Sequence, residues 1–282
     1  MRNNFVRLSA VAVLSYAVGC TPQDQLMSLT PQPGESIRTE QAYPGQTGPW
    51  KKGYWLNKEA TYQALNGEAI VDGDMVLHPH DLSDELQPEP ETTGRTRSSA
   101  KWPNKTVMYQ IDTSVPNPDL VTQAIAHWEA MTLIRFVKRT TERGFVLFRG
   151  GSGCSSNVGR IGVQQYVTTG SGCSLGNIIH EIGHTVGLWH EQNRADRDGH
   201  VTINFGNIQP GTENNFQTYV QMNYDGLDLG TALDFGSIMM YSPYEFSSNG
   251  QPTITRKDGS LYSIQRNGLS PLDVATVKAM YP

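Results

Sequence analysis

The chain has 282 residues, a formal net charge of −5 and 37% hydrophobic residues, with 28 glycines and 16 prolines. These values are typical of a loop-rich globular protein, and the length suits one ordinary domain with substantial additional segments. The 22 basic and 27 acidic residues form no long block of one sign, which argues against nucleic acid as a partner. The only long apolar stretch is N-terminal, so we expect no transmembrane span in the mature protein.

Residues 1–19 have the features of an export signal. Two arginines precede a short apolar run that ends in small residues before Cys20. Residues 17–20, Ala-Val-Gly-Cys, resemble a bacterial lipoprotein cleavage box, although alanine stands where leucine is usual. Two outcomes stay open: a protein released by secretion, or one anchored in the cell envelope by a lipid on Cys20.

The other cysteines fit an exported protein. With Cys20 assigned to export, Cys154 and Cys173 remain as a pair that can form a disulfide in an oxidising compartment. The alternative is two free buried thiols.

The N-terminal part of the chain is polar and rich in turns. Residues 21 to about 48 are rich in Pro, Gln, Thr and Gly, which predicts a mobile tether without a compact core. Residues 50–80 contain turn signals at Asn66-Gly67 and at Asp72-Gly73-Asp74. Residues 81–97 are again polar, which indicates an exposed, cleavable linker.

From Lys101 onward the chain shows regular periodicity. Apolar and β-branched runs predict strands, and amphipathic spacing after a capping residue predicts helices. The expected strands are residues 107–111, 133–137, 145–148 and 161–165. The first expected helix opens at Asn117-Pro118 and has apolar residues at Val121, Ile125 and Trp128; the others cover residues 175–188 and 270–280. Ser270-Pro271 with Asp273 supplies an N-terminal cap for the last helix.

The segment from His180 to His190 carries the chemistry. Positions i and i+4 of a helix share a face, so His180 and His184 can direct their imidazoles at one point. Gly187 can adopt the positive φ that ends a helix, after which His190 supplies a third nitrogen. Three neutral imidazoles leave one position of a zinc ion open, which is typical of a catalytic site.

Glu181 follows the first ligand and points away from direct coordination, toward the open position. There it can take a proton from a zinc-bound water, whose pKa falls to about 7 from near 16. The expected reaction is peptide-bond hydrolysis. An isolated HExxH pattern occurs by chance in many helices, but Gly187 and His190 at the correct offsets argue against chance.

The extended pattern resembles the metzincin clan, and the run His190-Glu191-Gln192-Asn193-Arg194 resembles the astacin family within it. Further similarity lies in residues 133–137, 151–154, 158–160 and 237–241, so the resemblance spans residues 102–281. It implies an α+β, two-lobed metzincin (zincin-like) domain with a twisted mixed sheet and a long active-site helix. One Zn²⁺ and protein or peptide substrates are implied with it, and the catalytic domain is expected at residues 93–282.

The resemblance also assigns roles to residues after the zinc helix. Met239 lies in a Met-turn beneath the zinc ligands. Tyr241 is a switchable tyrosine that binds zinc at rest and swings away to stabilise the oxyanion through its phenol. Without the resemblance, both would be interpreted as ordinary core residues.

Activation is implied as well. In the family, the glutamate at the position of Glu191 contacts the new N-terminus that activation creates. Similarity places this terminus near Thr93, while Arg95 and Arg97 offer sites for a trypsin-like activator, so we expect proteolysis near residues 92–97.

The prosegment, expected at residues 20–92, also shows a resemblance. Val71-Asp72-Gly73-Asp74 is similar to the Phe-x-Gly-Asp motif of astacin prosegments, with Val replacing Phe. By this resemblance Asp74 binds zinc in place of the water and keeps the enzyme latent. The alternative is an Asp-Gly-Asp surface turn.

Two departures from the family pattern are present. Leu133 stands where a second disulfide would have a cysteine, and Met240 replaces the histidine common before the switch tyrosine. Apart from these departures, two other functions stay open. One is a non-catalytic, surface-anchored binding module that retains zinc for structure, although such a module would not need Glu181. The other is a metalloenzyme that acts on non-protein substrates. We expect a monomer whose partners are its substrates and an activating protease.

Overall fold

The computed structural model of the chain describes residues 40–86, 100–222, 224 and 226–282. The expected export signal, Cys20 and the activation region near residues 92–97 lie outside these ranges. Among the described residues, no helix has the length and apolar character needed to cross a membrane.

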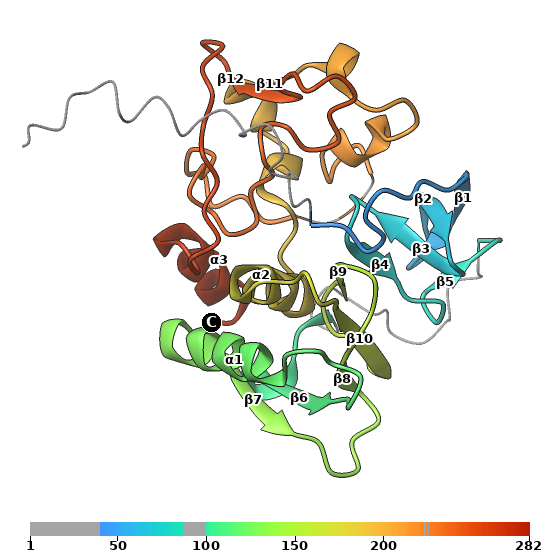
Figure 1. Cartoon of the computed structure of the whole chain (residues 1–282). Helices are drawn as coiled ribbons and strands as arrows, with labels where there is room; N and C mark the ends of the chain where they lie inside the picture. Colours follow the sequence, from blue (N-terminus) through green and yellow to red (C-terminus); the bar gives the residue numbers. More distant parts are fainter. Residues whose placement is uncertain (1–39, 87–99, 223, 225) are drawn as a thin grey trace, which may run out of the picture. The chain divides into compact units, whose positions relative to one another are not determined.

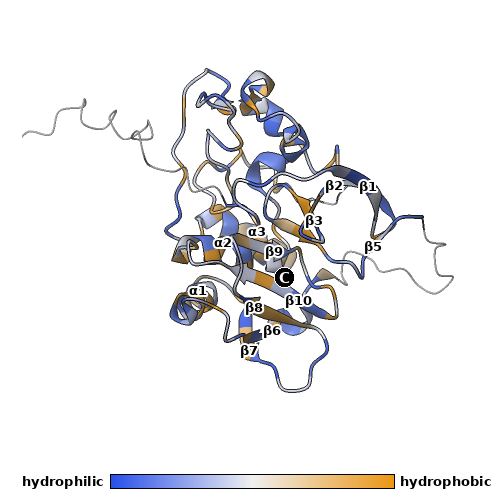
Figure 2. Ribbon diagram, turned by 45° about the vertical axis from the view of Figure 1, so that its right-hand side comes forward, coloured by the Kyte–Doolittle hydropathy of each residue, from blue (hydrophilic) through white to orange (hydrophobic). Residues whose placement is uncertain are grey.

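Five strands form the part of the main sheet that follows residue 100. They are β6 (Thr106–Ile111), β7 (Arg135–Lys138), β8 (Phe145–Arg149), β9 (Cys154–Asn157) and β10 (Gln164–Thr169), in the order β9-β10-β8-β6-β7. Neighbours in this half are parallel except β9, which is antiparallel to β10. The strand expected at residues 161–165 begins only at Gln164, because Gly162 adopts φ 91 and turns the chain. The hydrophobic colour of β8 in Figure 2 matches its burial in the core.

Three helices accompany this sheet: α1 (Pro118–Met131), α2 (Leu175–Val186) and α3 (Pro271–Met280). Helices α1 and α2 lie side by side in Figure 1, and the Trp128 indole N–H donates to the carbonyl of Ile179 between them. Ser270 and Asp273 form the predicted cap of α3, whose Val277 returns to the same hydrophobic core.

The chain between α2 and α3 is mostly irregular, as expected. It contains one two-stranded ribbon, β11 (Val201–Ile203) with β12 (Ile254–Arg256), and short 3-10 turns. These turns are η3 (Glu191–Asn193), η4 (Arg197–Gly199), η5 (Phe205–Asn207) and η6 (Glu213–Phe216), and η2 (Pro103–Lys105) precedes β6. The α+β class with a mixed sheet is confirmed.

The described part of the prosegment extends the same sheet. Its strands are β1 (Trp50–Trp55), β2 (Lys58–Leu65), β3 (Glu68–Val71), β4 (Met75–Leu77) and β5 (Leu82–Ser83), in the order β5-β1-β2-β3-β4. They pair antiparallel with one another, and β4 then pairs in parallel with β9, which gives ten strands. The turns at Asn66-Gly67 and Asp72-Gly73 are confirmed, with positive φ at all four residues.

The tether expected for residues 21 to about 48 is wrong at its C-terminal end. Glu40 and Ala42 are 7% and 3% exposed. The Ala42 N–H donates to the carbonyl of Gly73, and the Cys154 N–H donates to the carbonyl of Gln41. Composition was misleading because partners distant in sequence supply the burial that this segment cannot supply itself.

Cys154 and Cys173 form a disulfide, with a Cα–Cα distance of 6.0 Å. The bond joins β9 to the residue that precedes the N-cap of α2, so it links the sheet to the start of this helix. Leu133, at the position of the missing second disulfide, is 54% exposed.

Candidate metal centre

Helix α2 carries the first two candidate ligands, and the sequence determines both of its ends. Ser174 and Asn177 form a reciprocal capping box that satisfies N–H groups of the first turn. Gly187 adopts φ 111, a left-handed conformation that glycine enters without steric cost, and its N–H returns to carbonyls of the last turn. The helix therefore ends soon after His184, as predicted, and the chain turns toward His190.

Three buried histidines converge through their Nε2 atoms. His180 Nε2 lies 3.1 Å from His184 Nε2, and the ring centroids of His184 and His190 are 4.7 Å apart. Backbone carbonyls orient the two helical rings, with His180 Nδ1 at 2.8 Å from Ile238 O and His184 Nδ1 at 2.9 Å from Leu188 O. Because Nδ1 faces a carbonyl, Nε2 is left as the metal-binding nitrogen.

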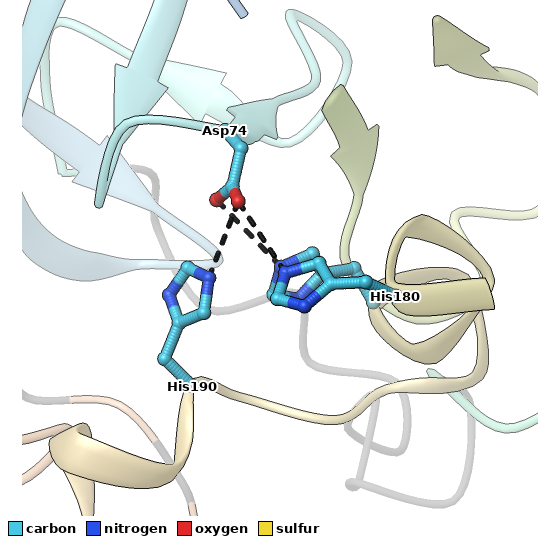
Figure 3. A group of neighbouring side chains, drawn as sticks. Asp74, His180 and His190 are labelled. Atoms are coloured by element: carbon cyan, nitrogen blue, oxygen red, sulfur yellow. Dashed lines mark hydrogen bonds and ion pairs between the residues drawn. The ribbon is translucent and has the colours of Figure 1, made fainter. Parts of the chain in front are cut away.

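Asp74 of the prosegment completes this group, as Figure 3 shows. Its Oδ2 lies 3.3 Å from His190 Nε2 and 3.4 Å from His180 Nε2, and its Oδ1 lies 3.6 Å from His184 Nε2. The ligand atoms of these four buried residues all lie within 4.8 Å of one another. The structure thus brings together the four residues expected to bind zinc in the latent form.

The donor set fits a zinc ion. The 3.1 Å between the first two Nε2 atoms is close to the roughly 3.3 Å that separates two nitrogen ligands of tetrahedral zinc. Burial lowers the pKa of His184 to about 4, so this imidazole is neutral and free to bind a metal. Burial also opposes a charge on His190, but the Asp74 and Asp72 carboxylates raise its pKa to about 10. The Asp74 carboxylate, which faces the Nε2 atoms, therefore favours positive charge at the point where the nitrogens converge, whereas Asp72 lies 3.8 Å from Nδ1 of His190.

Glu181 lies buried on the helix beside the first ligand. Neither of its carboxylate oxygens has a hydrogen-bond partner among the described residues. Burial, followed by the charges of Asp74 and Glu40, raises the pKa of Glu181 well above its usual range. A buried carboxylate without a structural partner is what a general base requires, and the catalytic role of Glu181 stays a prediction.

Tyr241 lies with its ring beside His190, at a centroid distance of 4.5 Å. Its phenol donates a 2.5 Å hydrogen bond to the backbone carbonyl of Asp72. A backbone carbonyl of the prosegment therefore fixes the position of the Tyr241 hydroxyl. Whether Tyr241 alternates between the metal and an oxyanion stays a prediction.

Met239 packs directly against helix α2 at Gly183. A Cβ atom on Gly183 would come within 2.7 Å of the Met239 sulfur, so this glycine permits the close packing. Asp273 holds the turn of residues 237–241, which carries Met239. Its carboxylate accepts from the Ser237 hydroxyl at 2.6 Å and from the Ile238 N–H at 2.9 Å. Asp273 was expected only to cap α3. The carbonyl of Ile238 is the group that orients His180, so Asp273 supports the metal centre through one intervening residue.

Glu191 is the residue expected to contact the new N-terminus after activation. In this chain its Oε1 accepts from the Asp234 N–H at 2.8 Å and lies 3.4 Å from an Arg194 nitrogen. Burial raises the pKa of Glu191 to about 7. The expected N-terminus near Thr93 lies outside the described residues, so this contact stays a prediction.

Sequence reasoning missed Glu40. Its carboxylate accepts from Arg266 and from the Asn177 amide at 2.6 Å, and its Oε2 lies 3.6 Å from His180 Nδ1. Burial alone would raise the pKa of Glu40, but the charges of His180 and Arg266 lower it below its usual value. No local signal could have identified this residue, because its partners lie far away in the sequence.

Comparison with known proteins identifies the family of this site. The model of the family "Astacin (Peptidase family M12A)" matches residues 94–282. Blastula protease 10 of Paracentrotus lividus is 37% identical over 228 residues, which cover 74% of this chain and 38% of that protein. Protein SpAN of Strongylocentrotus purpuratus is 34% identical over 238 residues, which cover 80% of this chain and 38% of that protein. The chain thus spans about 38% of the length of these two curated relatives.

A solved structure supports the same assignment. High choriolytic enzyme 1 (HCE-1), a hatching enzyme zinc-protease from Oryzias latipes (medaka fish), matches with a TM-score of 0.60 and 33% sequence identity. The match covers 67% of this chain and 98% of that one. The family match includes all three histidines, Glu181 and the turn that carries Met239. This chain belongs to the astacin family, peptidase family M12A.

Proposed function

We propose that this chain is a zinc-dependent endopeptidase that its own prosegment holds latent. The observation that carries the proposal is the buried group of three histidines with Glu181 beside them, whose carboxylate has no hydrogen-bond partner in the part of the chain that the structure describes. A site that only held zinc for structure would close the fourth position with a ligand from the mature domain. Here the fourth ligand comes from Asp74, in the segment expected to be removed.

Each residue of the site has a separate task in hydrolysis. The three histidines would hold a zinc ion, which would supply Lewis acidity and lower the pKa of water to near neutral. Glu181 takes the proton of the attacking water and delivers it to the leaving amine. Tyr241, released from the Asp72 carbonyl, donates its O–H to the oxyanion of the tetrahedral intermediate. Met239 supports His180 and His184 by packing against their helix at Gly183.

Strand β9, which becomes an edge of the sheet when β4 leaves with the prosegment, supplies the binding surface for the peptide. Strand β9 bears β4 on one side, with Met75 opposite Ser156 and Val76 opposite Asn157. A substrate strand that replaces β4 pairs with the same backbone groups of β9. Main-chain pairing of this kind binds extended peptides with little dependence on their sequence.

Three contacts support latency. Asp74 occupies the point where the histidine nitrogens converge, the Asp72 carbonyl holds the Tyr241 phenol, and β4 covers the edge of β9.

Residues 20–92 form the prosegment in this proposal and residues 93–282 the catalytic domain, with activation by a second protease near residues 92–97. The protein is exported, either released or anchored by a lipid on Cys20, and it acts on proteins or peptides as a monomer.

The proposal is tested with casein as substrate. Zinc-loaded full-length chain, the same chain after limited trypsin treatment, and Glu181→Ala are assayed with and without a zinc chelator. We expect cleavage only after trypsin treatment, complete loss with chelator, and loss of at least about a hundredfold in the variant. Glu142→Gln, a change at a partly exposed carboxylate between β7 and β8 that accepts from the N–H groups of Thr140 and Thr141, serves as the matched control and should retain full activity.

One outcome would reject the proposal. If the processed protein contained zinc and its new N-terminus were verified, but no protein or peptide were cleaved, the binding-module function would replace it. Acyl and phosphoryl esters in parallel assays test the remaining alternative, a metalloenzyme for non-protein substrates.

A further inference from the structure

An aromatic pair lies next to the metal centre on the catalytic domain. Trp189, which directly precedes His190, stacks on Tyr224 with ring centroids 5.0 Å apart and an interplanar angle of 12°. Burial, followed by the charge of Asp72, raises the pKa of the Tyr224 hydroxyl. Tyr219, Met222 and Val158 belong to the same hydrophobic cluster, and together these five residues form what we call the aromatic subsite.

The prosegment covers this subsite with large apolar side chains. The Trp55 ring meets both aromatic rings edge-on, at 6.1 Å and 85° from Trp189 and at 5.0 Å and 76° from Tyr224. Met75 and Leu77 of β4 enter the same cluster, whereas Val76 between them packs on a different one. Side chains therefore alternate along β4, as in any strand, with every second one directed at the aromatic subsite.

The lining of the subsite suits a neutral apolar side chain. The Tyr219 hydroxyl donates to Asp228 at 2.7 Å, so its polar end is already engaged and its ring is left for packing. Asp72, whose charge contributes to the raised pKa of Tyr224, belongs to the prosegment and leaves with it. Once the prosegment is gone, the stacked rings and Met222 lose the apolar partners that now cover them, and water at these surfaces costs free energy.

We propose that the aromatic subsite binds a large apolar side chain of the substrate, preferably aromatic, at one of the alternate positions next to the cleaved bond. The inference rests on the proposed peptidase function and deepens it. A substrate strand that replaces β4 on β9 directs alternate side chains to the surface where Met75, Leu77 and Trp55 now lie. Edge-to-face contact with a stacked pair favours an aromatic ring over an aliphatic chain of equal area.

The test is a cleavage profile of the trypsin-activated full chain. A peptide library is randomised at the three positions on each side of the cut, and matched peptides then compare Phe with Ser at the position the library selects. We expect Phe, Tyr, Trp, Leu or Met to be selected at one or two positions. Tyr224→Ala should lower the Phe-to-Ser ratio of kcat/KM by roughly tenfold, while Tyr224→Phe, which keeps the ring, should retain it.

Val220→Ala is the matched control, because Val220 lies in the same loop but is 60% exposed and outside the cluster. It should leave both the ratio and the activity unchanged. A flat library profile of the wild-type enzyme overturns the subsite, and so does a Tyr224→Ala enzyme with an unchanged ratio. If Tyr224→Ala loses activity on every peptide, its Phe-to-Ser ratio cannot be measured. The library profile of the wild-type enzyme then supports the subsite if it selects large apolar residues and overturns it if it is flat. Absence of cleavage by the wild-type enzyme would instead reject the peptidase function, and the subsite with it.

Discussion

Glu40 and Arg266 form a largely buried ion pair between segments that are 226 residues apart in sequence. Arg266 Nε lies 2.8 Å from Glu40 Oε1, and Arg266 Nη2 lies 2.5 Å from Oε2. The same guanidinium donates to the carbonyl of Met240 at 3.1 Å, and Glu40 also accepts from Asn177 at the start of α2. The pair therefore joins the prosegment to both elements that support the histidines, without using the metal.

We expect Glu40→Ala to weaken the docking of the prosegment. The change leaves Arg266 buried without its carboxylate, and loss of one partner of a buried pair typically costs about 3 to 5 kcal/mol. After trypsin treatment, the prosegment should dissociate faster from the variant than from the wild type, as followed by size-exclusion chromatography. Glu59→Gln is the control, since Glu59 is exposed and its ion pair is with Lys52, which is also exposed, a contact that contributes little to stability. Equal dissociation of the two variants would contradict the role of the ion pair.

Removal of the metal should not release the prosegment. The pairing of β4 with β9 and the contact between Glu40 and Arg266 involve no metal ligand. After the linker has been cut, treatment with chelator should leave most of the prosegment in complex with the catalytic domain on the same column. Complete release by chelator alone would show that Asp74 is the dominant anchor.

Asp74→Asn should give the uncut chain measurable activity, because an amide is a weaker zinc ligand than a carboxylate. The activity should stay well below that of the processed enzyme, because β4 still covers β9. Casein cleavage by uncut protein, with its integrity verified by mass spectrometry, measures this. Asp84→Asn, a change at an exposed residue of the prosegment, should leave the uncut chain as inactive as the uncut wild type. If uncut Asp74→Asn had no activity, the covering of β9 by β4 would be sufficient to maintain latency.

Asp273→Asn should weaken zinc binding without touching a ligand. Asp273 holds the Ile238 N–H, and the Ile238 carbonyl orients His180. Loss of such a support typically lowers metal affinity about 10- to 100-fold, which competition with a zinc-binding dye can measure. Asp258→Asn, at an exposed carboxylate that pairs with Ser260, is the control. An unchanged affinity in Asp273→Asn would limit this residue to capping α3.

Replacement of both Cys154 and Cys173 by serine should destabilise the chain by about 3 kcal/mol, because the bond closes a loop of roughly 20 residues. Denaturant unfolding of the variant, compared with oxidised and reduced wild type, checks this value. Reduced wild type should resemble the variant. Stability equal to that of the oxidised protein would argue that the loop between β9 and α2 is held by packing alone.

Much of the fold that follows residue 100 could be predicted because its signals are local. The spacing of Val121, Ile125 and Trp128 predicted α1, and the Ser270 cap predicted the start of α3. The five strands of the prosegment were not predicted beyond their turns. Residues such as Trp55 and Met75 find their apolar partners in the catalytic domain, so their role appears only when the two parts are packed together.

By itself, the sequence determined the three histidines, Glu181 and the end of the helix at Gly187, because helical periodicity and a glycine conformation place them within eleven residues of one another. It also indicated Asp74 through a short motif. Only the tertiary structure decided that Asp74 reaches all three imidazoles, that Tyr241 is held by a prosegment carbonyl, and that Glu40 pairs with Arg266. These contacts join residues far apart in the chain, and their formation depends on the packing of the whole sheet, which no local pattern encodes.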